Sequence, residues 1–524
     1  MRKVWLKTVL CLGMIGSGAL AEESLDETME GFDDTPVVQQ DAPMEKAVES
    51  DTLMAGFDDE SGAMEGEDDA QDESMEAFED DEETLDAKGG STAEKSTFLP
   101  AGLSGELTQQ FAFSYNKDKP KNLFSSLRQT LFLDYEHTFE NGVKVKINAK
   151  AFYDGMYDVK KADYTQEELD SLRTEIRLYD AYLEWSFNDH FDAKAGRQVV
   201  VWGRSDTIRI TDVLNPLDNR RPGIVDIEDL RLPTTMLRFD YSIGDWRITP
   251  IVILEQQFTL NPPYGSIYNP LPYDAELYRE YGLRLPYIPR QETYRDPTFA
   301  VSIGGEFPGW DISFYAAHIY DDIGYLKEQG NIFFQPGVKI YHDKVNMFGM
   351  ALNVLSGSWL FKTEWAYWDK LRFTAANDKT FNRIDGLVGF EYSGISETTI
   401  SYDIAVRHFM EYDDRLGVKS MPNPLYPAYS SESTIPLAPI EKNTYQHAFR
   451  IRSNFINDTL HLNYLHTRYG LGLEKGGFQR AWVKYDIADA INTEVGVVDY
   501  FGGTPLFDEV KDEMLFFMDI SYSF

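Results

Sequence analysis

The sequence predicts an all-β protein: a closed antiparallel transmembrane β-barrel of about 18 strands, with 16 as the alternative, and a disordered acidic tail before it. Three observations support this. Apolar and polar residues alternate from about residue 101 onward, short and long connections alternate between the strands, and the last strand ends on Phe524. The expected organisation is a signal peptide at residues 1–21, the tail at 22–100 and the barrel at 101–524.

Residues 1–21 have the features of a cleavable secretory signal. Basic residues at Arg2, Lys3 and Lys7 precede a short apolar run, and Ala19-Leu20-Ala21 forms an A-x-A site. Cleavage there removes Cys11, the one cysteine of the chain, so neither disulfide nor thiolate chemistry is expected. The expected location is the outer membrane of a Gram-negative bacterium, with the tail in the periplasm.

The tail is strongly acidic. Residues 22–95 contain 28 acidic and 3 basic side chains and few large apolar residues, so we expect them to be disordered. The net charge of the whole chain is -38. This acidity argues against nucleic acid as a partner, because phosphate binding requires a basic face.

A short pattern of an apolar pair beside acidic residues recurs in the tail. Its main positions are Met29, Phe32, Asp33 and Asp34, then Met54, Phe57, Asp58 and Asp59, then Met75 and Phe78. One interpretation is a solvated spacer. Another is a set of linear motifs that dock into a basic-rimmed apolar groove of a periplasmic partner, where several weak copies raise the effective concentration. Calcium binding is a weaker interpretation, because no copy has the spacing of a calcium loop.

The body of the chain alternates with period two. In residues 143–151, Val145 and Ile147 share one face, and Lys146 and Asn148 share the other; residues 400–407 and 480–487 repeat the pattern. A soluble sandwich also alternates, but its apolar faces need a second sheet. A long meander without crossovers instead favours a barrel with a lipid-facing apolar surface and a polar lumen.

The connections between strands predict the strand count. Tight turns are expected near residues 140–142, 188–190, 244–245, 308–309, 356–358, 394–396, 456–458 and 489–490. Longer loops are expected near residues 115–125, 159–175, 204–233, 259–297, 325–339, 372–381, 411–443, 472–477 and 504–512. Eight turns and nine loops imply 18 strands, and an even number returns both chain ends to the periplasm.

The last strand resembles an assembly signal. Phe516, Met518 and Ile520 share one face with Tyr522 and the terminal Phe524. Outer-membrane assembly machinery recognises such a strand in barrel substrates. We therefore expect this machinery as a partner, with Tyr522 and Phe524 in the signal.

The loop at residues 204–233 has a high density of mixed charge. We predict that ion pairs hold it against the lumen wall as a constriction; the alternative is an exposed extracellular loop. The residues expected to form the constriction are Arg197, Gln198, Trp202, Arg204, Asp206, Arg209, Asp212, Asn215, Asp218, Arg220 and Arg221. Strict alternation would turn Arg197 toward lipid at a cost of about 2–4 kcal/mol, which predicts a bulge at Gly196 or a strand end that moves it inward.

This segment also resembles a known family. Gly196-Arg197-Gln198, Trp202-Gly203, Ser205-Asp206, Asp212 and Asn215-Pro216 resemble the signature of the outer-membrane barrel family called domain of unknown function 1302. The resemblance implies handling of lipids or other hydrophobic compounds, together with an RND-type inner-membrane transporter and periplasmic lipid-binding partners. No catalytic residues come with it.

Two further loops are rich in proline and tyrosine. Residues 259–297 are expected to form a lid or a rigid extracellular cap, since proline stiffens the backbone and tyrosine supplies flat amphipathic surface. The expected lid aromatics are Tyr264, Tyr268, Tyr273, Tyr278, Tyr281 and Tyr287. Residues 411–443 repeat this composition more weakly.

Catalytic and metal-binding motifs are missing from the sequence. The eight histidines form no metal-spaced group, and no hydrolase, metalloprotease or phosphate-loop motif occurs. We therefore expect no enzyme, cofactor or metal. The expected function is transport of a hydrophobic or lipid-like compound with an RND-type partner recruited by the tail. The alternatives are a diffusive porin for small polar solutes and a structural or adhesive surface barrel.

Overall fold

The computed structural model of the chain describes residues 102–116, 124–159, 164, 166–225, 228–263, 266–268, 296–329, 337–418, 420–422, 434–436, 439–508 and 510–524. The expected signal peptide and acidic tail lie outside these residues, as does the whole repeat pattern. Within the described residues, no helix is long and apolar enough to cross a membrane.

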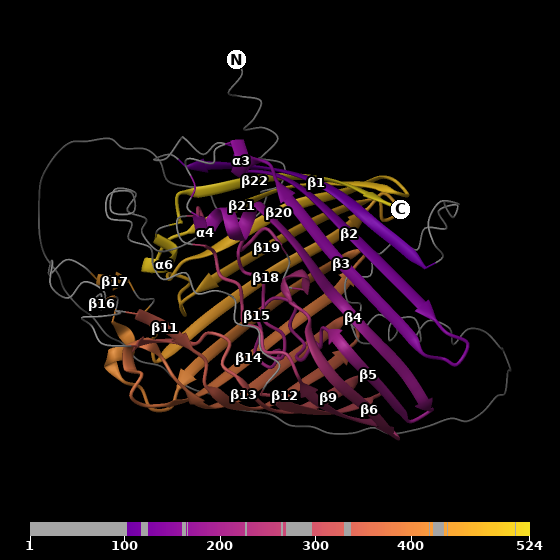
Figure 1. Cartoon of the computed structure of the whole chain (residues 1–524), viewed down its shortest axis with the longest axis horizontal. Coiled ribbons are helices and arrows are strands. Elements are labelled where there is room, and N and C mark those ends of the chain that lie inside the picture. Colours follow the sequence, from indigo (N-terminus) through magenta and orange to yellow (C-terminus); the bar gives the residue numbers. More distant parts are fainter. Residues whose placement is uncertain are drawn as a thin grey trace, which may run out of the picture. The chain divides into compact units, whose positions relative to one another are not determined.

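Eighteen long strands form one sheet, and every pairing in it is antiparallel. They are β1 (Leu103–Asn116), β2 (Ser126–Thr138), β3 (Lys144–Asp154), β4 (Thr174–Asn188), β5 (Phe191–Gln198), β6 (Thr234–Ile243), β7 (Trp246–Ile253), β8 (Thr298–Phe307), β9 (Trp310–Tyr320), β12 (Lys344–Ser356), β13 (Trp359–Leu371), β14 (Phe381–Ile395), β15 (Thr398–Phe409), β18 (Asn443–Phe455), β19 (Leu460–Tyr469), β20 (Gly477–Ala488), β21 (Ile491–Phe501) and β22 (Glu513–Ser523). Each strand pairs with the next of these along the chain (Figure 1).

The first and last strands close the sheet into a barrel. β1 pairs with β22 from Glu106 opposite Ser523 to Asn116 opposite Glu513. Gly105 and Phe524 extend this pairing, because each backbone N–H donates to the other's carbonyl at 2.9 Å. Closure leaves no unpaired strand edge, which is the condition for strands to cross a bilayer. The expected 18-stranded barrel is confirmed.

The connections lie where the sequence predicts them. Each of the eight predicted turns joins two paired strands, and the chain ends at the same end of the barrel as these turns (Figure 1). The nine longer loops join strands at the opposite end, and six of them carry short elements in their described residues. These are α3 (Met156–Val159), α4 (Gln166–Glu168), the π-helix η3 (Leu169–Arg173), the 3-10 turns η4 (Glu228–Leu230), η5 (Thr374–Ala376) and η6 (Asp414–Gly417), α6 (Pro505–Asp508), and the hairpins β10–β11 (Tyr325–Gln329, Gly337–Tyr341) and β16–β17 (Ser420–Pro422, Thr434–Pro436).

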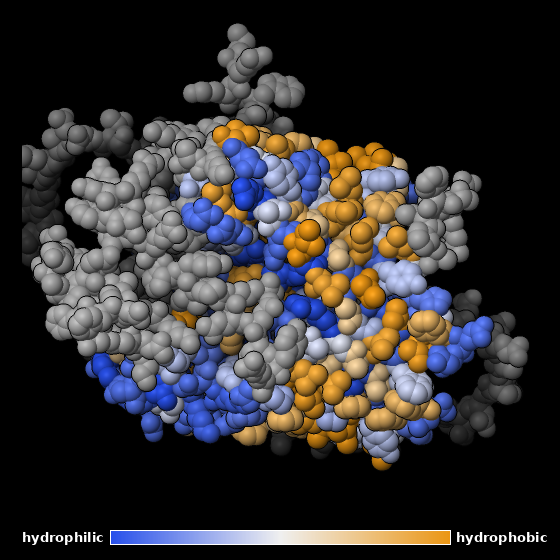
Figure 2. All heavy atoms as spheres, in the orientation of Figure 1, coloured by the Kyte–Doolittle hydropathy of each residue, from blue (hydrophilic) through white to orange (hydrophobic). Residues whose placement is uncertain are grey.

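The two faces of the strands differ in polarity as the alternation predicts. On β3, Ile147 points outward with 45% exposure, whereas Lys146 and Asn148 point inward with 2% and 1%. On β14, outward Val388 is 58% exposed beside inward Leu387 at 1%. Apolar side chains therefore cover much of the outer surface of the strands (Figure 2), as a lipid-facing wall requires.

Aromatic side chains gather near the tight turns. Trp185 stacks on Phe187 at 4.4 Å between ring centroids, and Phe307 stacks on Trp310 at the same distance. Tyr522 and Phe524, the expected assembly signal, point outward at this end with 49% and 37% exposure. Such a group of rings fits the aromatic girdle at the membrane–water interface of outer-membrane barrels.

Candidate functional site

The candidate site is the segment between β5 and β6, residues 199–233, which we call the inner loop. It begins at an irregular strand end. Gly196 has a φ of 134°, and a Cβ there would lie 2.2 Å from the Ala181 carbonyl oxygen. The Arg197 guanidinium then pairs at 3.0 Å with Glu255, a fully buried carboxylate just after β7. Arg197 is thus neutralised inside the protein instead of facing lipid.

One wall carboxylate fixes the start of the inner loop. Glu364 on β13 is 1% exposed and accepts four hydrogen bonds from the loop. The donors are the backbone N–H groups of Arg204, Ser205 and Thr211, at 2.7, 2.9 and 3.1 Å, and the Thr211 hydroxyl at 2.8 Å. A buried carboxylate needs such compensation, because burial without partners is costly. Glu364 therefore joins the loop to the wall.

Further pairs extend the attachment to other strands. The hydroxyls of Ser205 and Thr207 both donate to Asp403 of β15 at 2.7 Å. Arg204 pairs with Asp311 of β9 at 2.7 Å. Asp206 lies 3.8 Å from Lys362 of β13 and 3.3 Å from Arg452 of β18. Burial alone would raise the pKa of Asp206, but the charges of Lys362 and Arg452 outweigh it and lower the pKa.

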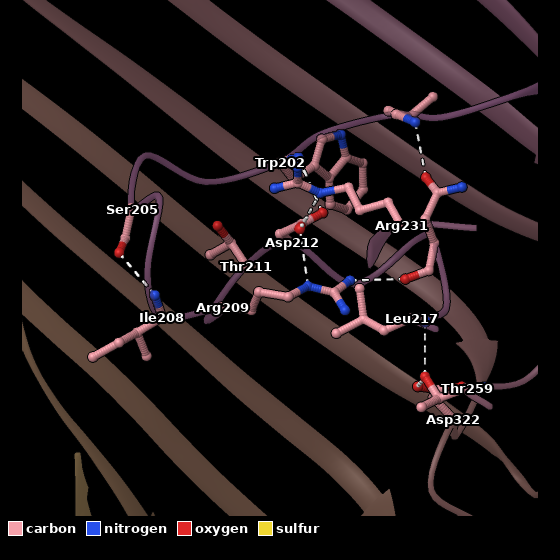
Figure 3. Close-up of polar contacts among 12 residues, drawn as sticks. Trp202, Ser205, Ile208, Arg209, Thr211, Asp212, Leu217, Arg231, Thr259 and Asp322 are labelled. Carbon is pink, nitrogen blue, oxygen red and sulfur yellow. Dashed lines mark hydrogen bonds and ion pairs between the residues drawn. The ribbon is translucent and has the colours of Figure 1, made fainter. Parts of the chain in front are cut away.

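The inner loop is also tied to itself. Asp212 accepts from Arg209 and Arg231, each at 2.9 Å, and these two arginines approach it from two stretches of the loop (Figure 3). Asn215 receives the Val200 N–H at 2.8 Å and donates to the Leu232 carbonyl at 2.9 Å. These contacts link the beginning and the end of the inner loop and hold them in one conformation.

The far part of the inner loop reaches the opposite side of the barrel. Arg220 pairs with Asp218 within the loop and, at 2.6 Å, with Glu175 of β4. Arg221 donates to Gln110 of β1, and the Pro222 carbonyl accepts from the Tyr500 hydroxyl of β21 at 2.7 Å. Burial alone would raise the pKa of Asp218, but the hydrogen bonds and charge of Arg220 lower it to about 2.

The apolar side chains of the inner loop also pack against two different sides of the barrel wall. Val200, Trp202, Ile208, Ile210 and Leu214 belong to a buried cluster with inward side chains of the wall from β6 to β15. Trp202 stacks on Tyr315 of β9 at 4.8 Å between centroids. Ile224 belongs to a second buried cluster with Ala112, Trp482, Val498 and Phe517 of β1 and β20–β22. The inner loop therefore spans the lumen from one wall to the other.

The structure brings together most of the residues predicted for the constriction. Arg204, Asp206, Arg209, Asp212, Asn215, Asp218, Arg220 and Arg221 all make the loop or wall contacts given above. Gln198 is 1% exposed and donates to the Met236 carbonyl, and Trp202 packs on the wall. Among the predicted lid aromatics, Tyr268 is buried in the cluster around Ile224. The other five lie outside the described residues.

Sequence reasoning missed the wall residues that receive the inner loop. Glu364, Asp311, Glu175 and Glu255 were not singled out, because acidic residues are frequent throughout the body of the chain. Alternation did place Asp403 on the inward face, but nothing in the sequence paired it with Ser205, 198 residues away.

Two small cavities lie between the inner loop and the wall. The first, of about 210 Å³, adjoins Arg209 and Asp212 and the wall side chains Trp368, Arg383 and Arg407. The second, of about 70 Å³, adjoins Arg220 and Arg221 and the wall side chains Arg128 and Arg177. In the described part of the chain, no three His, Cys, Asp or Glu side chains are arranged to hold a metal ion.

A family model described as "Protein of unknown function (DUF1302)" matches residues 113–524. The chain belongs to this family. The match spans the barrel and its inner loop, so the family expected from residues 196–216 is confirmed. None of the curated proteins compared with this DUF1302 protein matches it.

Several solved outer-membrane proteins resemble this DUF1302 chain in fold. OccAB3 of Acinetobacter baumannii has a TM-score of 0.46 and 13% identity, covering 80% of this chain and 98% of that one. OpdK of Pseudomonas aeruginosa, solved with vanillate, has a TM-score of 0.45 and 8% identity, with coverages of 80% and 98%. A loop L8 deletion mutant of OmpT of Vibrio cholerae has 0.34 and 9%, with the same coverages.

Proposed function

We propose that this DUF1302 protein is an outer-membrane transport barrel for a hydrophobic or lipid-like compound, closed by its inner loop until that loop moves. One observation carries the proposal: a cluster of buried apolar side chains lies on the inward face of the wall beneath the loop, beside the charged residues that anchor the loop. Its buried inward side chains include Met236, Ile251, Tyr315, Ala317, Ile319, Val345, Met347, Leu387, Ala405 and Phe409.

An apolar cluster of this extent is unusual on the inward face of a water-filled channel, whose interior is normally polar. Here the inner loop covers that face with Trp202, Ile208 and Ile210, each 4% exposed or less. Displacement of the loop would expose an apolar path along β6–β15. Such a path favours a hydrophobic compound, because burial of its apolar surface makes its transfer from water onto this wall favourable.

The attachments of the inner loop support a closed resting state. The loop is bonded to β1, β4, β9, β13, β15 and β21. Contacts to so many strands oppose a permanently open pore.

The second candidate function is a diffusive porin for small polar solutes. Charged side chains from both the loop and the wall, among them Arg204, Asp206 and Lys362, meet inside the barrel and favour this function. A charged constriction selects polar solutes by its field.

Three measurements on the purified full-length protein separate these functions. We expect planar-bilayer recordings without a large steady conductance, and saturable binding of decanol, an uncharged amphiphile, in calorimetry. A large steady conductance together with swelling of arabinose-loaded liposomes would instead support the porin.

The acidic tail is the part of the chain that we propose binds a partner. The repeats around Phe32, Phe57 and Phe78 would recruit an RND-type inner-membrane transporter. We expect the triple Phe→Ala variant and a deletion of residues 22–100 to lose that transporter in pull-downs from solubilised membranes. Unchanged recovery with both variants would refute recruitment while leaving the transport proposal standing.

A further inference from the structure

Basic side chains dominate the smaller cavity, between the far part of the inner loop and β2–β4. Among the described residues, five cations line it against three carboxylates. The cations are Arg128, Lys150, Arg177, Arg220 and Arg221, and the carboxylates are Glu175, Asp218 and Asp229. A buried surplus of one sign of charge is costly unless a counter-charge is supplied.

Two of these carboxylates form hydrogen bonds with a single arginine, Arg220. Arg220 takes Asp218 and one oxygen of Glu175, and it also donates to the Ser171 carbonyl at 2.7 Å. Arg177 shares the other Glu175 oxygen through Nε, at 3.0 Å, and Nη2. Its remaining nitrogen, Nη1, is buried and has no hydrogen-bond partner among the described residues. Arg177 as a whole is also buried, with 6% exposure.

The other cations of the cavity are not neutralised inside it. Arg128 forms a 3.7 Å ion pair with Asp154, which is not part of the cavity lining, and its Nη2 donates to the Leu172 carbonyl at 3.1 Å. Its Nε has no hydrogen-bond partner in the described chain. Asp154 also accepts from the Ser126 hydroxyl at 2.5 Å and the Leu127 N–H at 2.9 Å. Lys150 has no carboxylate partner in the part of the chain that the structure describes; its ammonium lies 5.8 Å from the Tyr179 ring centroid.

The size and lining of the cavity fit the head of an anionic amphiphile. A volume of about 70 Å³ admits a carboxylate or phosphate group but not a long chain. The Phe152 ring lies 4.0 Å from the Arg128 guanidinium and 5.7 Å from that of Arg220, and this holds both guanidinium groups in place. Leu172, Val225 and Leu230 supply an apolar border for the first part of a chain.

The larger cavity lacks this surplus of positive charge. Arg209, Arg383 and Arg407 there face four aspartates, and Arg383 is already bound to Asp385 through two hydrogen bonds of 2.7 Å. Of the arginines that line the two cavities, those with a buried guanidinium nitrogen that has no hydrogen-bond partner in the described chain, Arg128 and Arg177, both line the smaller cavity.

From this geometry we infer that the smaller cavity binds the carboxylate or phosphate head of an anionic amphiphile, with Lys150, Arg177 and Arg128 donating to it. The guanidinium fork suits the planar or tetrahedral oxygens of these groups. The inference deepens the proposed function and rests on it, because it assigns the charged end of the proposed cargo.

Calorimetry on the detergent-solubilised full-length protein tests this inference. The probes are decanoate, decyl phosphate and uncharged decanol. We expect at least one anionic probe to bind roughly tenfold more tightly than decanol, because each charge-assisted hydrogen bond contributes more than a neutral one. The two anionic probes distinguish a carboxylate head from a phosphate head.

Three variants complete the test. Arg177→Gln and Lys150→Gln are each expected to weaken anion binding roughly tenfold without changing decanol binding. Lys150 has no described carboxylate partner, so its variant remains informative if Arg177→Gln fails to fold. Lys484→Gln removes an inward lysine from β20 on another part of the wall and is the matched control, expected to bind like wild type.

The outcomes separate this inference from the proposed function. If decanol binds and neither anion binds more tightly, or if Lys150→Gln matches wild type, the inference is wrong and the transport proposal stands. If the anions bind in a Lys150-dependent way while decanol does not bind and steady conductance is seen, the anion site stands and the hydrophobic cargo is wrong.

Discussion

The two parts of the inner loop meet the barrel in different ways. Residues 200–215 rest on the apolar cluster of the wall, and many of their polar groups are matched by Glu364, Asp403 and Asp212. Residues 216–225 lie beside the smaller cavity, where the cations outnumber the carboxylates and two arginines keep unpartnered buried nitrogens. The first part has the contacts of an anchor, whereas the wall beside the second part retains donors, on Arg128 of β2 and Arg177 of β4, for a further group.

This difference indicates that the two parts of the inner loop have different roles, the first in closure and the second in binding. A matched set of buried hydrogen bonds stabilises one conformation, since each donor left without its acceptor costs about 1–3 kcal/mol. An unmatched set lowers the stability of the empty protein and favours the state in which a ligand supplies the missing charge. We expect changes in the first part to open the barrel and changes in the second to alter binding.

The largest effect is expected from Glu364→Ala. The substitution leaves four buried donors of the inner loop without their acceptor. A loss of at least about 3 kcal/mol in the free energy that holds the loop raises the displaced population by roughly 100-fold. Single-channel recording should show frequent open events that wild type lacks.

A second carboxylate provides the control for this prediction. Glu136 at the tight-turn end forms an exposed ion pair with Lys144, and exposed pairs contribute at most about 1 kcal/mol. Glu136→Ala should record like wild type. Silent recordings from a folded Glu364→Ala protein would show that Glu364 does not hold the barrel closed.

A smaller effect is expected from Gly203→Ala. Gly203 has a φ of 94°, and a Cβ there would lie 2.8 Å from the Glu364 carboxylate and 2.9 Å from the Thr211 hydroxyl. The strain, of about 1–3 kcal/mol, disturbs the same anchor and should give rarer open events than Glu364→Ala.

Gly244→Ala is the matched control for backbone strain. Gly244 lies in the turn between β6 and β7 at a φ of 58°, and a Cβ there would meet no atom within 4 Å. It should lower the thermal stability slightly and leave the recordings unchanged. Equal recordings from the two alanine variants would mean that the contact at Gly203 is unimportant for closure.

The sequence predicted the barrel better than it predicted the site, and the reason is physical. A bilayer requires an apolar residue at every second position of each strand, so alternation located residues such as Ile147 and Lys146 on the correct faces. No such requirement acts on the loops, and the β10–β11 and β16–β17 hairpins were not predicted. The inner loop showed its charge in the sequence, but its acceptors lie far along the chain; Glu364 is 159 residues from Ser205.

The smallest expected effect is a difference in how pH changes the stability of the regions around the first and the second part of the inner loop. Burial, together with the charge of Asp322, raises the pKa of Asp321 to about 6; this carboxyl lines the larger cavity. A raised carboxyl pKa means that the folded state binds the proton more tightly than the unfolded state, so stability falls as pH rises toward 6. Acidification from pH 7.5 to 5 should stabilise this region by about 1 kcal/mol. Asp218, with a pKa of about 2, stays ionised throughout this range and should contribute no change near the smaller cavity.

Hydrogen exchange, corrected for the intrinsic effect of pH, measures both regions in one sample. Peptides covering residues 319–326 should exchange several-fold more slowly at pH 5 than at pH 7.5, and those covering 216–225 should not change. Asp321→Asn should abolish this slowing at pH 5. His342, whose Nδ1 lies 2.6 Å from the Asp321 carbonyl oxygen, acts in the opposite direction: burial lowers its pKa, so acidification charges an imidazole that the folded state holds neutral and destabilises this region. Identical pH responses in wild type and Asp321→Asn would place the titrating group elsewhere, and equal responses in the two peptides would contradict the contrast between the two parts of the inner loop.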